Sequence, residues 1–168
     1  MKKIVIIVAP KDYRDEEFEE PREIFDAKGF EVTIASKGVE IAKGALGGNT
    51  RVDIDVYDIS VDNYDAFVFV GGSGAKIYFE DRKIEILVRQ AAEKGKVLGA
   101  ICIAPTILGN AGVLMGKKVA SWASQEENLK SHGAEYTGNL VEVDGKIVTA
   151  NGPKAAKEFG EKIAKLLE

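Results

Sequence analysis

Cys102 is the only cysteine of the chain, and it lies between an apolar run and a proline. The run Val97–Ile101 is short and continuous, which predicts a strand buried on both faces. Pro105 suits the first turn of a helix, where its missing N–H is no loss. A side chain at such a strand-to-helix turn projects clear of the sheet, and the positive end of the helix favours its thiolate. The pattern therefore predicts a nucleophile, the alternative being a small buried apolar side chain.

A glycine-rich segment, Gly71-Gly72-Ser73-Gly74, follows another apolar run at residues 66–70. It does not match the dinucleotide-binding pattern, because Ile77 stands where a glycine is needed, and no Gly-Lys-Ser/Thr follows for a phosphate-binding loop. We therefore expect its backbone N–H groups to approach whatever is bound at Cys102 and to donate to an oxyanion.

The stretch Asp15–Glu20 is rich in carboxylates, most of which are predicted to lie in solvent at the start of a helix. One of them is expected to point toward the thiol, become neutral there and donate a hydrogen bond to the thiolate. The residues alone leave open which one. His132, the only histidine, lies in a polar segment and is expected at the surface or in a helix cap. One cysteine and one histidine make no zinc ligand set, so neither a metal nor a cofactor is expected.

Buried strands alternating with amphipathic helices predict one α/β domain over residues 1–168, with a mostly parallel sheet covered on both faces. The ends of three strands, at Ala9, Gly71-Gly72 and Cys102, are expected to open onto one crevice. Pro21 is expected to kink the first helix or mark its start. The predicted strands are 3–9, 30–36, 39–42, 52–56, 66–70, 97–101, 118–121, 140–143 and 146–150, and the later helices are 81–94, 105–111, 125–131 and 154–167.

Composition excludes several classes of protein. The net charge of −4 argues against a nucleic-acid-binding face. A single cysteine forms no internal disulfide, which suits the reducing cytoplasm. The apolar run Ile4–Ala9 near the N-terminus is too short for a signal peptide or a membrane span.

The glycine pair after a strand and the sequence Ala100–Pro105 around the cysteine resemble the ThiJ/PfpI superfamily, which includes protein deglycases and PfpI-type intracellular proteases. The resemblance covers the whole chain. It implies a flavodoxin-like, doubly wound domain, a homodimer or larger oligomer, and Cys102 as the nucleophile.

The same resemblance implies roles for five further residues. The acidic partner of the family stands four residues before a proline, which selects Glu17. Gly72 and Ile103 would supply oxyanion N–H groups. Arg51 falls where the deglycase branch has an arginine near the site, and Trp122 stands where that branch has a histidine, so both are candidates for substrate binding.

Departures from the family pattern bear on the activity. The protease branch has a histidine directly after the cysteine, where this chain has Ile103, and a glutamate near the position of Lys76. Glutamine amidotransferases share the elbow but need a downstream His/Glu pair that is missing here. The expected function is a thiol-dependent stress-response enzyme that acts on small reactive carbonyls such as methylglyoxal. The alternatives are a redox sensor, with Cys102 oxidised to a sulfinic acid, and a disfavoured cysteine peptidase.

Overall fold

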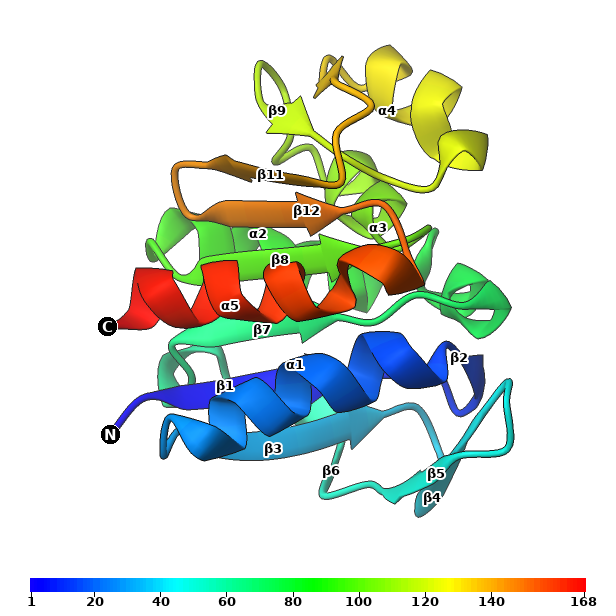
Figure 1. The fold of residues 1–168 in the computed structure, drawn as a ribbon, viewed down its shortest axis with the longest axis vertical. Helices are drawn as coiled ribbons and strands as arrows, with labels where there is room; N and C mark the ends of the chain where they lie inside the picture. The colour runs from blue at the N-terminus through cyan, green and yellow to red at the C-terminus, as the bar shows by residue number, and fades with distance from the viewer.

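A seven-stranded sheet forms the centre of the computed structural model, which describes residues 1–168 (Figure 1). Its order is β11-β12-β8-β7-β1-β3-β6, and every pair is parallel except β11 with β12. The strands are β1 (Lys3–Ile7), β3 (Glu31–Ser36), β6 (Ile54–Asp55), β7 (Ala66–Phe69), β8 (Val97–Ile101), β11 (Val141–Asp144) and β12 (Ile147–Ala150). The predicted α/β architecture with a mostly parallel sheet is confirmed.

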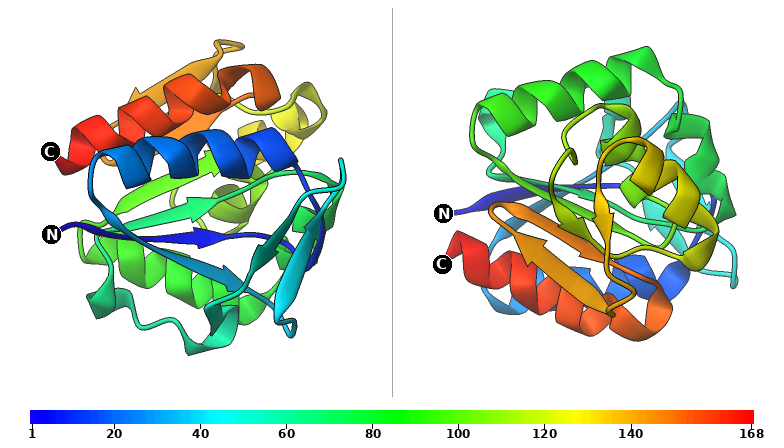
Figure 2. Two further views of the ribbon diagram at one scale, coloured as in Figure 1. Left: turned by 60° about the horizontal axis from the view of Figure 1, so that its bottom comes forward. Right: turned by 90° about the horizontal axis from the view of Figure 1, so that it is seen from above.

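Helices cover both faces of this sheet (Figures 1 and 2). One face carries α1 (Asp15–Ala27) and α5 (Ala156–Leu167), which lie side by side, and the other carries α2 (Arg82–Glu93) and α3 (Pro105–Asn110). Alternate residues of β1 enter the two cores, since Ile4 packs on the α1/α5 side and Val5 on the α2/α3 side. A strand with both faces buried loses the polar alternation of an exposed strand, which explains its continuous apolar sequence.

The α1 helix begins at Asp15 and passes through Pro21, so the expectation that Pro21 marks its start is wrong. Pro21 has no N–H to donate to the carbonyl oxygen of Glu17, one turn earlier. The α1 helix packs against α5 at this turn. A Cβ added at Gly160 of α5 would lie 2.9 Å from Pro21 Cα and 2.9 Å from Ile24 Cδ1, so the two helices approach closely at this glycine.

Two small sheets accompany the main one. The first joins β2 (Lys11–Tyr13), β4 (Ile41–Gly44) and β5 (Asn49–Arg51), and the second joins β9 (Lys118–Val119) to β10 (Glu135–Tyr136). The strand expected at 39–42 is present as β4, shifted by two residues, and the one expected at 52–56 is present as the shorter β6, whereas β2, β5 and β10 were not expected. Short helices complete the chain: α4 (Glu126–Ser131), η1 (Val56–Asp58), η2 (Val61–Asn63), η3 (Ser73–Tyr78), η4 (Ala123–Gln125) and η5 (Pro153–Ala155).

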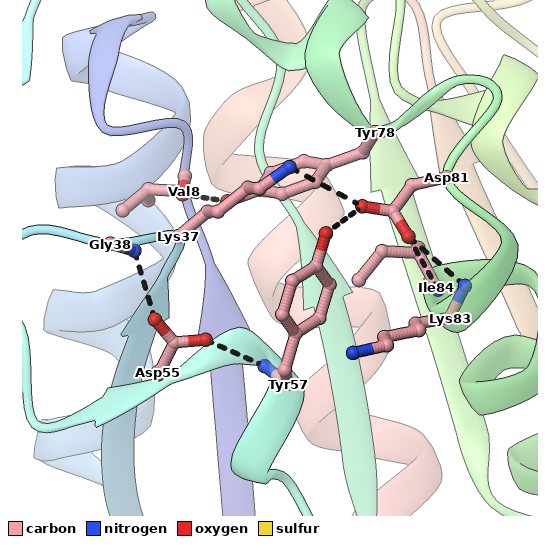
Figure 3. A network of polar contacts seen from close by, with 9 residues as sticks. All are labelled: Val8, Lys37, Gly38, Asp55, Tyr57, Tyr78, Asp81, Lys83 and Ile84. Atoms are coloured by element: carbon pink, nitrogen blue, oxygen red, sulfur yellow. Dashed lines mark hydrogen bonds and ion pairs between the residues drawn. The ribbon is translucent and has the colours of Figure 1, made fainter.

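A polar network holds the segment that follows the glycine pair (Figure 3). Tyr78, at the end of η3, donates its hydroxyl to the carbonyl oxygen of Val8 over 2.9 Å. Asp81 caps the N-terminus of α2 and accepts the Tyr57 hydroxyl at 2.5 Å. Lys37 forms an ion pair with the same carboxylate at 3.8 Å. The C-terminal end of η3 and the start of α2 are thereby tied to neighbouring strands and helices.

Candidate active site

Cys102 occupies the turn between β8 and α3, and its backbone is in the left-handed region at φ +65°. Such a conformation is strained for a residue with a side chain, and it persists only where its surroundings hold it. Here both backbone groups are bound: Cys102 N–H donates to Ala150 O over 2.9 Å, and Trp122 N–H donates to Cys102 O over 2.8 Å. The predicted elbow is thus present and is fixed from two sides.

The Glu17 side chain is fully buried and lies beside the thiol. Its Oε1 accepts the N–H of Gly71 at 3.0 Å, while Oε2 has no hydrogen-bond partner in the protein. A Cβ added at Gly71 would lie 2.5 Å from Cys102 Cβ and 2.5 Å from Glu17 Oε1. The acid and the thiol therefore meet over Gly71, where only a glycine fits.

Burial raises the pKa of both groups. The pKa of Glu17 rises from 4.5 to about 8, chiefly through desolvation of its carboxylate, although the contact with Cys102 and the Gly71 N–H oppose the shift. The pKa of Cys102 rises to about 12, through desolvation first and through the charge of Glu17 second. This shift is opposite in sign to the one expected from the positive end of the following helix alone. The α3 helix has only six residues, and its effect is outweighed by burial.

Two neighbouring groups with these pKa values titrate as a pair. The pair loses its first proton near pH 8, and these pKa values place the remaining proton mainly on sulfur, so the tautomer with the proton on Glu17 is the minor, reactive form. When that proton is on Glu17, the repulsion between carboxylate and thiolate disappears. The neutral acid then faces a thiolate, so this arrangement combines a nucleophile with a proton donor.

Two backbone N–H groups, from Gly72 and Ile103, lie against the sulfur of Cys102 and oppose the rise in its pKa. Gly72 has φ +97°, and a Cβ there would lie 2.5 Å from both Arg14 N and Asp12 O. A glycine is therefore required by conformation and by space alike. The structure brings together Cys102, Glu17, Gly72 and Ile103, as the sequence analysis expected.

A cavity of about 800 Å³ opens above the thiol. Trp122 forms part of its wall and is half exposed (51%), packing with its ring against Gly152. Arg51 does not line the cavity, since it is exposed on β5 and pairs with Ile41 of β4. The cavity is lined by Arg14, Glu16, Gly72, Ser73, Lys76, Cys102, Ile103, Trp122, Ser124, Gln125, Leu140, Asn151, Gly152, Pro153 and Lys154.

Arg14 is a cavity residue that the sequence analysis missed. It precedes the first residue of α1, and its guanidinium donates to both oxygens of Glu16, each over 2.9 Å. An arginine directly before an acidic helix start is the only sequence signal for this pair. Its neighbour Asp15 was expected in solvent, but it is buried and accepts the N–H groups of Leu46 at 3.0 Å and Gly48 at 2.8 Å.

His132 lies at the end of α4, where its Nδ1 contacts Asn128 O at 2.8 Å, and it does not line the cavity. No group of three or more His, Cys, Asp or Glu side chains is placed to bind a metal ion. No helix combines the length and the apolar character that crossing a membrane requires.

Comparisons with known proteins agree with this geometry. The model of the DJ-1/PfpI family matches residues 2–166. An uncharacterized protein of Methanocaldococcus jannaschii is 40% identical over 169 residues, covering 99% of this chain and 82% of that protein. A deglycase of Thermococcus kodakarensis is 31% identical over 163 residues, covering 97% of this chain and 98% of that protein. The crystal structure of a ThiJ/PfpI domain protein from Brachyspira murdochii has a TM-score of 0.95 at 29% identity, covering 98% of this chain and 95% of that one. The chain therefore belongs to the DJ-1/PfpI family.

Proposed function

We propose that the protein is a cysteine-dependent enzyme that converts small reactive carbonyls such as methylglyoxal, or their adducts, to hydroxy acids. The observation that carries this proposal is the buried Glu17, whose Oε2 has no hydrogen-bond partner and which lies against Cys102, a residue of the cavity wall. The relative in Thermococcus kodakarensis that is named a deglycase supports the same class of substrate.

The reaction begins when the Cys102 thiolate adds to the aldehyde carbon of the substrate. The carbonyl electron pair moves to oxygen, where the N–H groups of Gly72 and Ile103 stabilise the charge, and Glu17 donates its proton to give a hemithioacetal. The Glu17 carboxylate next removes the proton from the former aldehyde carbon, and the resulting enediolate is reprotonated at the adjacent carbon. This produces a thioester, which water hydrolyses to a 2-hydroxy acid and the free thiol.

Glu17 carries all of the acid–base work in this scheme, because no histidine lines the cavity. A peptidase of the cysteine–histidine type would need a base beside the sulfur. The residue after Cys102 is Ile103, and His132 is bound to the backbone of α4. A single carboxyl that serves as acid and base in turn predicts a slow enzyme.

The decisive experiment measures conversion of methylglyoxal to lactate by the intact protein and by Cys102→Ser. We expect turnover to be lost in Cys102→Ser and to fall by about 10²–10⁴-fold in Glu17→Gln, because general acid–base catalysis contributes that much. Glu23→Gln, an exposed change on the same helix, is the matched control and retains full activity. Full turnover by Cys102→Ser would exclude the mechanism.

A second function, sensing of oxidants, is favoured by the same pair. Peroxide would oxidise the Cys102 thiolate in two steps to a sulfinate, each step transferring one oxygen atom to sulfur and releasing water. Neutral Glu17 and the two N–H groups, which lie against the sulfur, would donate hydrogen bonds to the sulfinate oxygens. Mass spectrometry after mild peroxide treatment distinguishes this function, since a sensor gains two oxygen atoms at Cys102 without any carbonyl compound.

A further inference from the structure

The cavity above Cys102 contains two cations that form no ion pair. Arg14 is neutralised by Glu16, with two hydrogen bonds of 2.9 Å. Lys76 and Lys154 also line the cavity, yet neither has a carboxylate within 4.0 Å. The whole chain carries a net charge of −4, so this concentration of unpaired positive charge is local. Clefts lined by one sign of charge attract ligands of the opposite sign.

The topology places these lysines on opposite sides of the thiol. Lys76 lies on η3, which follows β7, and Lys154 lies on η5, which follows β12. The strand order is β12-β8-β7, so β8, with Cys102 at its end, runs between the two (Figure 1). An anionic group bound by both lysines would therefore lie over the elbow, within the same cavity as the sulfur.

The size of the cavity indicates a substrate larger than methylglyoxal. Its volume of about 800 Å³ lies in the range that holds drug-sized ligands, whereas methylglyoxal has five non-hydrogen atoms. Trp122 and Leu140 contribute apolar surface to the wall. There is room for a reacting carbonyl at Cys102 and for a charged group several bonds away.

We propose that the cavity selects carbonyl compounds that carry an anionic group, a phosphate or a carboxylate, and that Lys76 and Lys154 bind this group while the carbonyl carbon lies at Cys102. The inference rests on the proposed function and narrows its substrate class. The reaction stays R–CO–CHO + H2O → R–CHOH–COOH, in which the aldehyde carbon is oxidised and the ketone carbon is reduced. The anionic group on R takes no part in bond making, so the two lysines are positioning residues.

The kinetic test compares methylglyoxal with its phosphate-bearing analogue, 3-phosphooxy-2-oxopropanal. We expect kcat/KM for the phosphorylated compound to exceed that for methylglyoxal by about tenfold or more, since hydrogen bonds to charged groups contribute at least that factor. In the double variant Lys76→Gln/Lys154→Gln this preference disappears through a higher KM, with kcat retained and methylglyoxal kinetics unchanged. Lys165→Gln, an exposed lysine on α5 outside the cavity, is the matched control.

Trp122 provides a readout that needs no turnover, because it is the only tryptophan and it lines the cavity. Its fluorescence is titrated with glycerol 3-phosphate, glycerate and glycerol, which differ in the group they carry. We expect saturable changes with one or both anions, none with glycerol, and loss of the response in the double lysine variant. A response to glycerol 3-phosphate alone identifies phosphate as the preferred group, and a response to glycerate alone identifies carboxylate.

The outcomes separate the two proposals. If methylglyoxal and the phosphorylated compound are converted equally well and the lysine variants change neither, the anion preference is wrong and the proposed carbonyl chemistry stands. If neither compound is converted, the proposed function is wrong for these carbonyls, and the fluorescence titration decides whether the lysines bind an anion. Equal responses to glycerol and to the anions, or none at all, would overturn the anion site.

Discussion

Gly71 donates its backbone N–H to Glu17 Oε1 over 3.0 Å, and this bond leaves Oε2 as the oxygen without a hydrogen-bond partner in the protein. The bond fixes the carboxyl group in a site where no water-exposed surface remains. Because the same glycine also lies against Cys102, its position sets the distance between the acid and the nucleophile.

The rate at which iodoacetamide alkylates Cys102 should rise with pH through an apparent pKa of about 8, the value to which burial raises Glu17. In Glu17→Gln the carboxyl proton that leaves first is missing. The increase in alkylation rate should therefore move to higher pH, toward the raised pKa of the buried thiol. Glu23→Gln should keep the original profile. Identical profiles in the protein and in Glu17→Gln would show that the two groups are not coupled.

Stability should depend on the charge of Glu17. The folded state raises its pKa from 4.5 to about 8, so between these values the folded protein holds a proton that the unfolded chain has released. The contribution of Glu17 to the free energy of unfolding should therefore be constant below pH 4.5 and fall as the pH rises toward 8, by at most about 1.4 kcal/mol per pH unit. Urea denaturation at several pH values measures this, and Glu17→Gln should lack this contribution.

Gly71→Ala should disrupt the site more than an ordinary glycine substitution. The added Cβ would meet Cys102, Glu17 and the carbonyl oxygen of Ile101 at 2.5 to 2.7 Å, so we expect a loss of about 1–3 kcal/mol and a changed alkylation profile. Gly38→Ala is the comparison, because Gly38 has φ +70° with nothing within 4 Å of its Cβ. It should cost about 1–2 kcal/mol from backbone strain and leave the thiol unchanged. An unaltered thiol in Gly71→Ala would contradict the close approach.

Asp15→Ala should loosen the β4–β5 turn without altering the thiol. The substitution removes the acceptor for the N–H groups of Leu46 and Gly48, and hydrogen bonds to a charged group contribute about 1.5–3 kcal/mol. Hydrogen exchange at these two amides should accelerate, while Cys102 keeps its alkylation profile. Glu23→Ala, an exposed change further along the same helix, should leave both measurements as they are. Slow exchange persisting in Asp15→Ala would show that other contacts hold the turn.

The elbow could be predicted because its signals are local. The apolar run of β8 and Pro105 at the start of α3 are both adjacent to Cys102 in the sequence. The identity of the acid could not be obtained in this way. Which carboxylate of the first turn faces the thiol depends on how α1 is rotated against the sheet, and only the family resemblance selected Glu17.

Arg14 and the strands β2 and β5 were missed for a related reason. The direction of the Arg14 side chain is set by its pairing with Glu16 at the rim of the cavity, a contact between residues that give no periodic signal. The strand β5 has only three residues, all polar, and the turn that joins it to β4 is held by Asp15 from a distant part of the chain. Pairings of this kind depend on tertiary structure, which residue patterns do not encode directly.

The first turn of α1 has a consequence for how this chain tolerates insertions and deletions. Three successive carboxylates point to three different partners there: Asp15 to the β4–β5 turn, Glu16 to Arg14, and Glu17 to Gly71. Successive residues of a helix are rotated by about 100°. If one residue were added or removed ahead of this turn and the helix axis stayed in place, each carboxylate would point where the adjacent one points now. The segment between β1 and α1 is therefore fixed in length by the contacts of Asp15 and Glu17 with distant parts of the chain, and natural length variation should fall elsewhere.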